Sequence, residues 1–132
     1  MRILIAEDDH ASRRFLFKII SQYDNCDITV DGIELLDAFS IAIEEKKPYD
    51  LIFLDIMMPK IDGIEALNII REIERKKGIL KEDSVKVIII SALNEKNSVD
   101  ECFELNCMDY LVKPIDKERL INILHRVKNI TK

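Results

Sequence analysis

Short apolar runs, each followed by a stretch whose apolar residues have helical spacing, recur five times along this chain. The clearest runs, Leu51–Leu54 and Val87–Ile90, are apolar at every position. A strand that is apolar on both sides has to be covered on both sides, and strands that alternate with helices pair in parallel. The pattern therefore predicts an α/β fold with a five-stranded parallel sheet between two layers of helices.

The predicted strands are Arg2–Ala6, Cys26–Val30, Leu51–Leu54, Val85–Ile90 and Tyr110–Val112. The predicted helices are Ala11–Tyr23, Ile33–Glu45, Ile64–Lys76, Ser98–Leu105 and Lys117–Lys128. A chain of 132 residues without a linker-like stretch or an internal repeat is expected to form one domain over residues 1–132. The connection from Lys76 to Asp83 is long for this fold, and the sequence suggests no function for it.

Composition excludes several classes of protein. Twenty Lys and Arg against 25 Asp and Glu give a net charge of −5, which argues against direct binding of nucleic acid. The apolar runs are too short to cross a membrane, and the N-terminus does not have the pattern of a signal peptide. Three cysteines, an odd number, indicate a reducing compartment rather than a disulfide framework. We therefore expect a cytoplasmic protein that does not bind membranes.

Ionisable and hydroxyl side chains stand where the predicted strands end. The first strand runs into Glu7 and Asp8, the third into Asp55, the fourth into Ser91 and the fifth into Lys113. A single aspartate after a strand is as readily a helix cap, a role that suits Asp9. In a parallel α/β sheet, however, ligands bind beyond the carboxyl ends of the strands, so side chains that converge there predict a functional site.

Glu7, Asp8 and Asp55 predict a site for a divalent cation. Carboxylates held close together repel one another unless a cation neutralises them, and oxygen ligands with access to water suit Mg²⁺. Asp8 and Asp55 are the expected direct ligands, with Glu7 acting through water. A carboxylate also attacks phosphorus in aspartyl-phosphate chemistry, and Lys113 and Ser91 would then contact phosphoryl oxygens.

At this point the sequence resembles the receiver domains of two-component response regulators over essentially the whole chain. The segments that carry the resemblance are Ile3–Asp9, Asp55–Pro59, Asp62-Gly63, Ser91-Ala92 and Asp109–Pro114. The resemblance implies a flavodoxin-like, doubly wound fold of the (β/α)5 type with strand order 2-1-3-4-5. It also implies a cis peptide bond between Lys113 and Pro114, which is a minority state for X–Pro bonds in general.

The same resemblance assigns a role to each candidate residue. Asp55 is the phospho-acceptor, Glu7 and Asp8 are the acidic pair, and the backbone carbonyl of Met57 is a further ligand of Mg²⁺, for which Mn²⁺ can substitute. Lys113 is the family's lysine, Ser91 the switch hydroxyl and Tyr110 the switch aromatic. Without the resemblance, the simpler interpretation of Tyr110 is packing against the fourth helix.

The implied mechanism is a two-state switch. A sensor histidine kinase or a histidine phosphotransfer protein supplies the phosphoryl group, and the receiver itself catalyses the transfer. Ser91 then moves towards the phosphoryl group and Tyr110 rotates into the vacated space, which changes the surface of the fourth helix, fifth strand and fifth helix. A downstream protein reads this surface, and a phosphorylation-dependent homodimer is also compatible with such a switch. In this role the chain is not an enzyme beyond its own phosphorylation and dephosphorylation.

Several residues depart from the family pattern. Asn106 stands near a position where glycine is common and can end a helix in the same left-handed conformation, and Ile115 stands where phenylalanine is common. Met57 and Leu93, two residues after Asp55 and Ser91, cannot orient an attacking water by hydrogen bonds. We therefore expect slow self-dephosphorylation, unless both are merely half-exposed loop residues.

Other side chains receive simpler interpretations. Cys102 and Cys107 are expected to be inert thiols rather than metal ligands, because no histidine lies close to them in the sequence. His10 and His125 are expected on the surface. The short basic runs, Arg13-Arg14 among them, are expected to be solvated.

Competing functions fit the sequence less well. A flavodoxin would bind phosphate with a loop rich in Ser, Thr and Gly, where this chain has Glu7, Asp8 and Asp9. An aspartyl-phosphate hydrolase of the haloacid dehalogenase type needs an aspartate at the position of Met57. A receiver that works without phosphorylation would not need the complete set of site residues.

The context of the domain leaves two alternatives open. The chain ends soon after the last predicted helix and contains no output domain, so it is either a stand-alone regulator or a receiver module cut from a hybrid kinase or a longer regulator. Its initial Met mildly favours a stand-alone protein.

Overall fold

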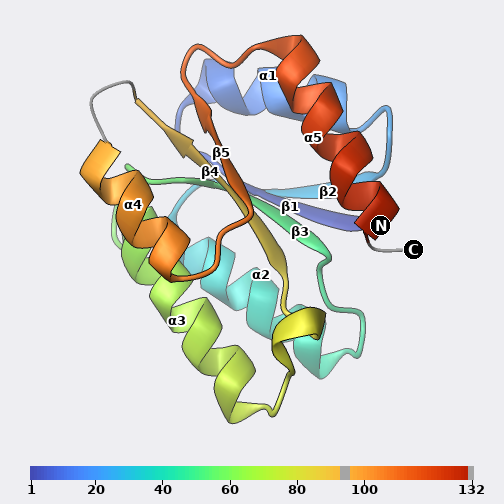
Figure 1. Cartoon of the computed structure of the whole chain (residues 1–132), viewed down its shortest axis with the longest axis vertical. Coiled ribbons are helices and arrows are strands. Elements are labelled where there is room, and N and C mark those ends of the chain that lie inside the picture. The colour runs from blue at the N-terminus through green and yellow to red at the C-terminus, as the bar shows by residue number, and fades with distance from the viewer. Residues whose placement is uncertain (93–95, 131–132) are drawn as a thin grey trace.

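The computed structural model describes residues 1–92 and 96–130 and has a five-stranded parallel sheet between two layers of helices (Figure 1). The strands are β1 (Arg2–Ala6), β2 (Asn25–Thr29), β3 (Leu51–Asp55), β4 (Lys86–Ser91) and β5 (Asp109–Val112). The helices are α1 (His10–Ile20), α2 (Gly32–Glu44), α3 (Gly63–Lys76), α4 (Lys96–Glu104) and α5 (Lys117–Ile130). The strand order β2-β1-β3-β4-β5 confirms the predicted doubly wound topology.

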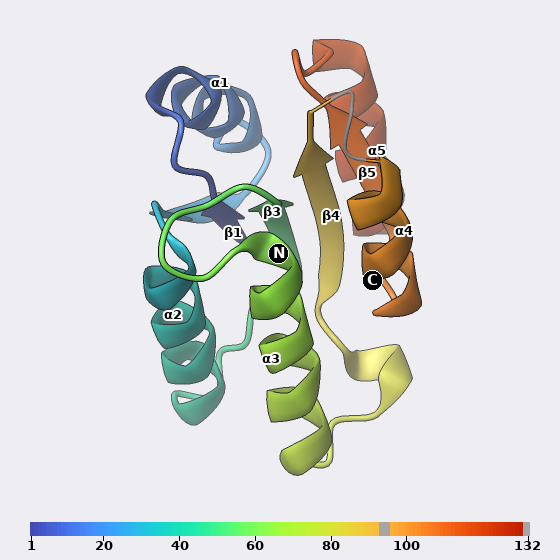
Figure 2. The same cartoon turned by 90° about the vertical axis from the view of Figure 1, so that its left-hand side faces the viewer.

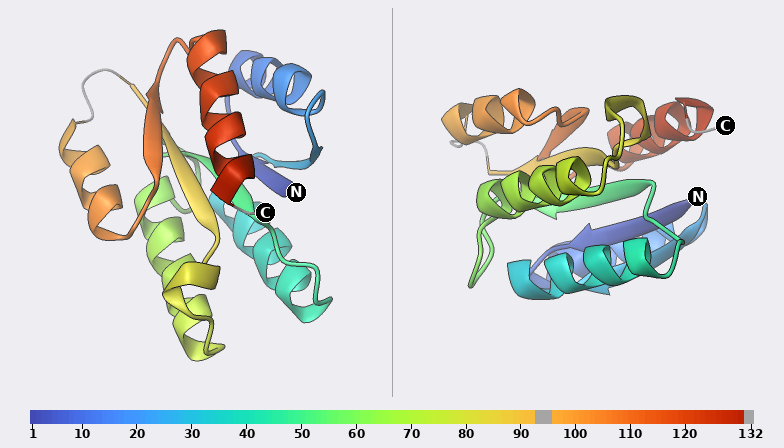
Figure 3. Two further views of the ribbon diagram at one scale, coloured as in Figure 1. Left: turned by 45° about the vertical axis from the view of Figure 1, so that its right-hand side comes forward. Right: turned by 90° about the horizontal axis from the view of Figure 1, so that it is seen from below.

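Successive residues of a central strand point to opposite faces of the sheet and so belong to two separate hydrophobic cores. Leu4 of β1 and Ile52 of β3 lie in the core beneath α2, α3 and α4, whereas Ile3 and Phe53 lie in the core beneath α1 and α5. Alternation of this kind follows from the pleat of a strand, and it explains why the central strands have no polar side. Figures 1 and 3 show α1 and α5 side by side on their face of the sheet.

The edge strand β2 was predicted at Cys26–Val30, lies at Asn25–Thr29, and is largely exposed, unlike the central strands. Only Thr29 of its five residues is buried, because β2 pairs with β1 alone and lies at the margin of the sheet. The α1 helix also ends at Ile20 rather than at Tyr23, since the chain turns after Ser21. A short 3₁₀ helix, Lys81–Asp83, lies within the long connection before β4 and was not predicted.

Local sequence signals explain how the helices begin. The side chains of Asp9, Asp31 and Asp62 cap α1, α2 and α3 by accepting backbone N–H groups three residues further on. Asn106 has a positive φ of 64°, as expected for its place after a helix, and the bond between Lys113 and Pro114 is cis, as the resemblance to receiver domains implies. None of the helices formed by the described residues is long and apolar enough to span a membrane.

Gly63 lets the start of α3 lie directly against the end of β3. A Cβ atom at this position would stand 2.3 Å from the carbonyl oxygen of Asp55, which no folded protein tolerates without a shift of the backbone. The N–H of Gly63 donates to the carbonyl of Ile56 at 2.7 Å. This close contact fixes the backbone that carries Asp55.

We expect Gly63→Ala to lower the free energy of unfolding by about 1–3 kcal/mol, because the added methyl group overpacks this contact. Gly78→Asn is the matched control: a Cβ at Gly78 meets nothing within 4 Å, and Asn tolerates its positive φ of 73°. Urea unfolding followed by circular dichroism measures both. Equal losses in the two variants would contradict this account of Gly63.

Candidate functional site

Three carboxylates meet at the carboxyl edge of the sheet. Glu7 and Asp8 follow β1, and Asp55 ends β3, which is the neighbour of β1 in the sheet. One oxygen from each of the three lies within 4.8 Å of the others. Glu7 and Asp55 are buried, whereas Asp8 is exposed to solvent. The three side chains therefore lie together as predicted, and the cluster is open to solvent at Asp8.

Lys113 lies between two of the carboxylates. Its Nζ is 2.9 Å from Oε1 of Glu7 and donates to Oδ2 of Asp55 at 3.2 Å. Lys113 comes from the loop after β5, so a residue far away in the sequence completes the cluster. One ammonium group faces three carboxylates, which leaves the cluster with an excess of negative charge when all of them are ionised. A divalent cation would offset this excess.

The surroundings raise the pKa of Asp55 far above the usual value of a carboxyl group. Burial is the largest cause, and the hydrogen bond and negative charge of Glu7 act in the same direction, while Lys113 opposes them. Burial lowers the pKa of Lys113, but contacts with Glu7 and Asp55 outweigh this effect and raise it overall. Lys113 therefore stays charged, and Asp55 holds a proton readily when no cation is near.

Backbone groups hold the carboxylates in place. The N–H of Met57 donates to Oδ1 of Asp55 at 3.2 Å, and the N–H of Asp9 donates to Oε2 of Glu7 at the same distance. The side chain of Met57 is 65% exposed and points away from the core. Its partner in the dephosphorylation hypothesis, Leu93, lies outside the described residues.

Arg13 binds the backbone of the loop that carries Glu7 and Asp8, a contact that the sequence analysis did not predict. Its Nη1 donates to the carbonyl oxygens of Glu7 and Asp8, both at 3.2 Å. The expectation that Arg13 is simply solvated was therefore wrong, whereas its neighbour Arg14 is exposed. No sequence motif indicates this contact, which arises because the first turn of α1 folds back over the loop.

Ser91 and Tyr110 line the same hollow. Ser91 is buried at the end of β4, and Tyr110 of β5 is 36% exposed. Together with Val99 and Phe103 of α4 they border a cavity of about 280 Å³. The ring of Tyr110 contacts Phe103 edge-on, with a centroid distance of 6.1 Å, so Tyr110 does pack against α4. The cavity beside it is space that an aromatic ring could enter.

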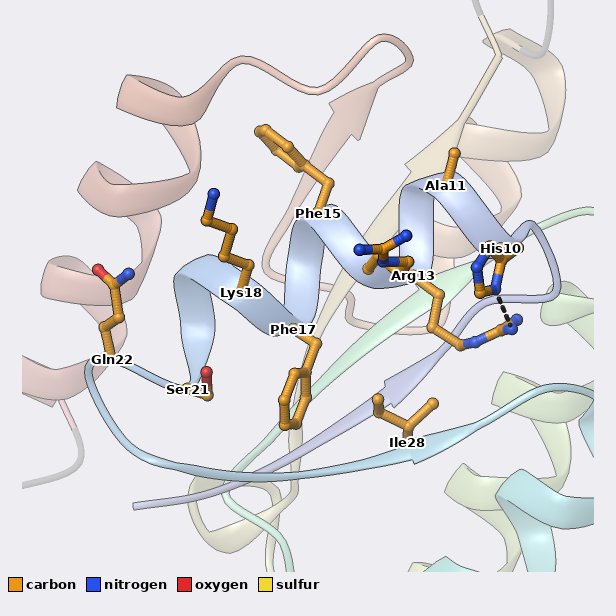
Figure 4. Close-up of a pocket in the computed structure, with 10 residues that line it drawn as sticks. His10, Ala11, Arg13, Phe15, Phe17, Lys18, Ser21, Gln22 and Ile28 are labelled. Carbon is orange, nitrogen blue, oxygen red and sulfur yellow. Dashed lines mark hydrogen bonds between the residues drawn. The ribbon is translucent and has the colours of Figure 1, made fainter.

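A second hollow, of about 780 Å³, lies on the outer side of α1 and does not include the carboxylates. Figure 4 shows Phe15 and Phe17 pointing to opposite sides of this helix, with Phe17 near Ile28 of β2. The ring of His10 lies against Arg13 (Figure 4). The hollow is larger than the cavity at Ser91, but it holds no acidic side chain and does not contribute to the cluster.

The remaining sulfur and imidazole groups agree with their simpler interpretations. Cys102 and Cys107 are free and buried, and burial raises the pKa of their thiols to about 12 and about 11. His10 and His125 are exposed. Among the described residues, the one group of acidic, cysteine and histidine side chains close enough to hold a metal ion is Glu7, Asp8 and Asp55.

Comparison with known proteins identifies the class of this fold and site. The family model of the response regulator receiver domain matches residues 3–125, so the chain belongs to that family. It is a receiver domain of two-component phosphorelay signalling, a class of signalling phospho-acceptors.

Individual relatives are similar over nearly the whole chain. The chemotaxis protein CheY of Treponema pallidum is 30% identical, and the alignment covers 99% of this chain and 83% of that protein. The solved receiver domain of the Francisella response regulator 1452 is 32% identical, with a TM-score of 0.74 and coverage of 99% of this chain and 98% of that one. The histidine-protein kinase BarA of Shigella flexneri is 30% identical over 97% of this chain, which spans only 13% of that kinase.

The raised pKa of Asp55 predicts a specific dependence of stability on pH. Without a metal ion, folded Asp55 keeps a proton that the unfolded chain releases above about pH 4, so its contribution to stability is lost as the pH rises. We expect Asp55→Asn to remove this loss and to raise the free energy of unfolding at about pH 8 by on the order of 1–3 kcal/mol. Urea titrations in the presence of a chelator measure the difference from wild type.

The control for this prediction is Asp8→Asn, which changes an exposed member of the same cluster and should alter the free energy of unfolding by less than about 0.5 kcal/mol. Other carboxyl groups, such as Asp24 and Asp109, have lowered pKa values and change stability in the opposite sense, so the difference between variant and wild type is the relevant quantity. A difference for Asp55→Asn that stays constant with pH would refute the prediction.

Proposed function

We propose that Asp55 accepts a phosphoryl group from a histidine of a sensor kinase or a phosphotransfer protein, in a reaction that requires Mg²⁺. The observation that carries this proposal is the cluster of Glu7, Asp8 and Asp55 around Lys113 at the end of β3. It combines a nucleophile, an excess of negative charge that needs a cation, and a lysine that remains charged. Relatives that include histidine kinases support the same partner class.

The donor set fits Mg²⁺. Asp8 and Asp55 offer carboxylate oxygens as direct ligands, and buried Glu7 would act through water. The backbone carbonyl of Met57, two residues after Asp55, is proposed as a further ligand. The cation, or Mn²⁺ in its place, would supply positive charge for the oxygens of the transferred phosphoryl group.

Asp55 and Lys113 have different roles in the phosphoryl transfer. Oδ of Asp55 attacks phosphorus, and the new P–O bond forms as the bond between phosphorus and the donor's imidazole nitrogen breaks, with the electron pair leaving on the imidazole. Lys113, already within hydrogen-bond distance of Asp55, donates to an oxygen of the new acyl phosphate. The chain thus catalyses its own phosphorylation and later dephosphorylation, with no other substrate turned over.

The phosphoryl group is proposed to act on the cavity beside Tyr110. Ser91 donates its hydroxyl to the phosphoryl group and Tyr110 turns into the adjoining space of about 280 Å³. The outer surface of α4, β5 and α5 changes as a result, and a downstream protein or a second phosphorylated copy binds to it. The proposal includes a cytoplasmic location and no direct binding of nucleic acid or membrane.

One receiver unit over residues 1–132 is part of this proposal, whether it works alone or as a module of a longer regulator. An aspartyl-phosphate hydrolase remains the alternative enzyme, but the exposed side chain of Met57 offers no acid or base beside Asp55. A receiver that signals without phosphorylation would not need Glu7 and Asp55 buried side by side, an arrangement that is unfavourable in itself.

The acceptor is tested with acetyl phosphate and Mg²⁺, followed by intact mass spectrometry. We expect one phosphoryl adduct on the wild-type chain, none on Asp55→Asn and none in excess chelator, because the nucleophile and the cation are both required. Asp62→Asn is the matched control, since this exposed aspartate follows the same strand, caps α3 and can be replaced by another capping residue. An adduct on Asp55→Asn, or its absence on wild type, would count against Asp55 as acceptor.

The side chain of Met57 predicts a slow loss of the phosphoryl group. Met57→Asn adds a hydrogen-bonding group at an exposed position beside Asp55, which should orient an attacking water and raise the decay rate about fivefold, the equivalent of one hydrogen bond. Met57→Leu keeps an apolar side chain and should leave the rate unchanged. Decay of the adduct is followed by mass after the acetyl phosphate is removed. An unchanged rate in Met57→Asn, and in its combination with Leu93→Glu, would remove the basis for this hypothesis.

A further inference from the structure

Arg71 of α3 ties together two segments that are distant from it in the sequence. Its Nε donates to the carbonyl of Leu105 at 2.9 Å, Nη2 donates to that of Asn106 at 3.1 Å, and Nη1 donates to that of Val85 at 3.0 Å. The side chain is only 15% exposed. All three guanidinium nitrogens thus bind backbone carbonyls of the turn after α4 and of the entry to β4.

Glu74, one turn further along α3, completes the arrangement. Its Oε1 accepts from Nη1 of Arg71 at 2.7 Å, and its Oε2 accepts the backbone N–H of Val85 at 2.7 Å. Glu74 is buried, so its charge depends on Arg71 for compensation. Hydrogen bonds to charged groups are stronger than those between neutral groups, which makes this a firm attachment of α3 to both segments.

The carbonyls of Leu105 and Asn106 lie where the end of a helix leaves acceptors without partners. The last carbonyls of an α-helix and of the turn that follows it have no partner within the helix, and positive charge is favourable there. Asn106, with its φ of 64°, turns the chain towards β5, and the N–H of Cys107 returns to the carbonyl of Cys102 at 3.2 Å. Arg71 therefore holds the C-terminal end of α4 in place from a neighbouring helix.

The body of α4 is packed differently from the turn that follows it. Val99 and Asp100 in the middle of α4 and Phe103 near its C-terminal end border the cavity that also contains Ser91 and Tyr110. Figure 2 shows α4 beside α3, with β4 leading up to the edge at which α4 begins. The helix itself therefore lies over a cavity at the switch residues, and the turn after it is bound to Arg71.

We propose that Arg71 is the positioning residue that anchors the turn Leu105-Asn106 after α4, so that switching at Ser91 and Tyr110 moves the helix about this turn while the turn itself stays in place. This inference rests on the proposed function, because it describes how phosphorylation of Asp55 reaches the surface. Packed elements shift between discrete arrangements rather than deform continuously, so a firmly bound turn acts as a fixed point. The anchor thus determines which part of the output surface changes.

Hydrogen–deuterium exchange of the full chain tests the proposal, before and after reaction with acetyl phosphate and Mg²⁺, with the phosphorylated fraction measured by intact mass in the same sample. In wild type we expect phosphorylation to change exchange in peptides covering residues 97–103 and to leave residues 104–108 unchanged. In Arg71→Gln we expect exchange at residues 104–108 to be about tenfold faster without phosphorylation, and to change further on phosphorylation.

Arg75→Gln is the matched control on the same helix. Arg75 is 71% exposed, and among the described side chains its ion pair is with Glu72, on the same helix, so its loss should leave the wild-type exchange pattern intact. Arg71→Lys keeps the charge but not the fork of donors, and should give an intermediate pattern. If Arg71→Gln does not fold because Glu74 is left unpaired, Arg71→Gln/Glu74→Gln removes both charges and is measured in its place.

The outcomes separate this inference from the proposed function. A wild-type chain that forms the adduct but changes exchange equally at residues 97–103 and 104–108 overturns the anchor, and so does Arg71→Gln if its change stays confined to residues 97–103. Absence of the adduct in wild type overturns the proposed function and the inference together.

Discussion

Mutual repulsion of the carboxylates at the end of β3 is the constraint on which the rest of the structure depends. Burial of Glu7 and Asp55 beside each other is unfavourable, and Lys113 offsets only part of their charge. The sheet has to be rigid enough to hold them together, which it achieves through apolar strands packed on both sides and through the contact of Gly63 with the backbone of Asp55. A site held in this unfavourable state gains most from binding a cation.

Much of this arrangement could be predicted from the sequence because it follows from periodicity and from the position of strand ends. Runs such as Leu51–Leu54 determine a buried parallel strand, and once the strands are parallel their carboxyl ends must share an edge. Asp55 and Lys113 are 58 positions apart but lie at that edge for the same reason. The strand order itself came from the resemblance to receiver domains, since periodicity does not distinguish one order from another.

Contacts made by long side chains across elements could not be predicted in the same way. Arg13 and Arg71 both donate to backbone carbonyls, and a carbonyl acceptor is present at every residue, so the sequence carries no complementary signal. The low burial of β2 results from its position at the edge of the sheet, which depends on its neighbours in the sheet rather than on its own composition. The contacts of Val85 with Arg71 and Glu74, just after the 3₁₀ helix at Lys81–Asp83, are likewise bonds to backbone groups and leave no mark in the sequence.

The two ends of the sheet therefore have different physical roles. At the carboxyl edge, charges that repel one another and a cavity of about 280 Å³ leave room for a second arrangement of Ser91 and Tyr110. Towards the opposite edge, Arg71 and Glu74 neutralise each other and satisfy the backbone groups of two segments, which favours a single arrangement. A switch uses both properties, because the helix that borders the cavity has space to move and the turn after it is held in place. In this chain α4 borders the cavity through Val99 and Phe103, and Arg71 holds the turn that follows.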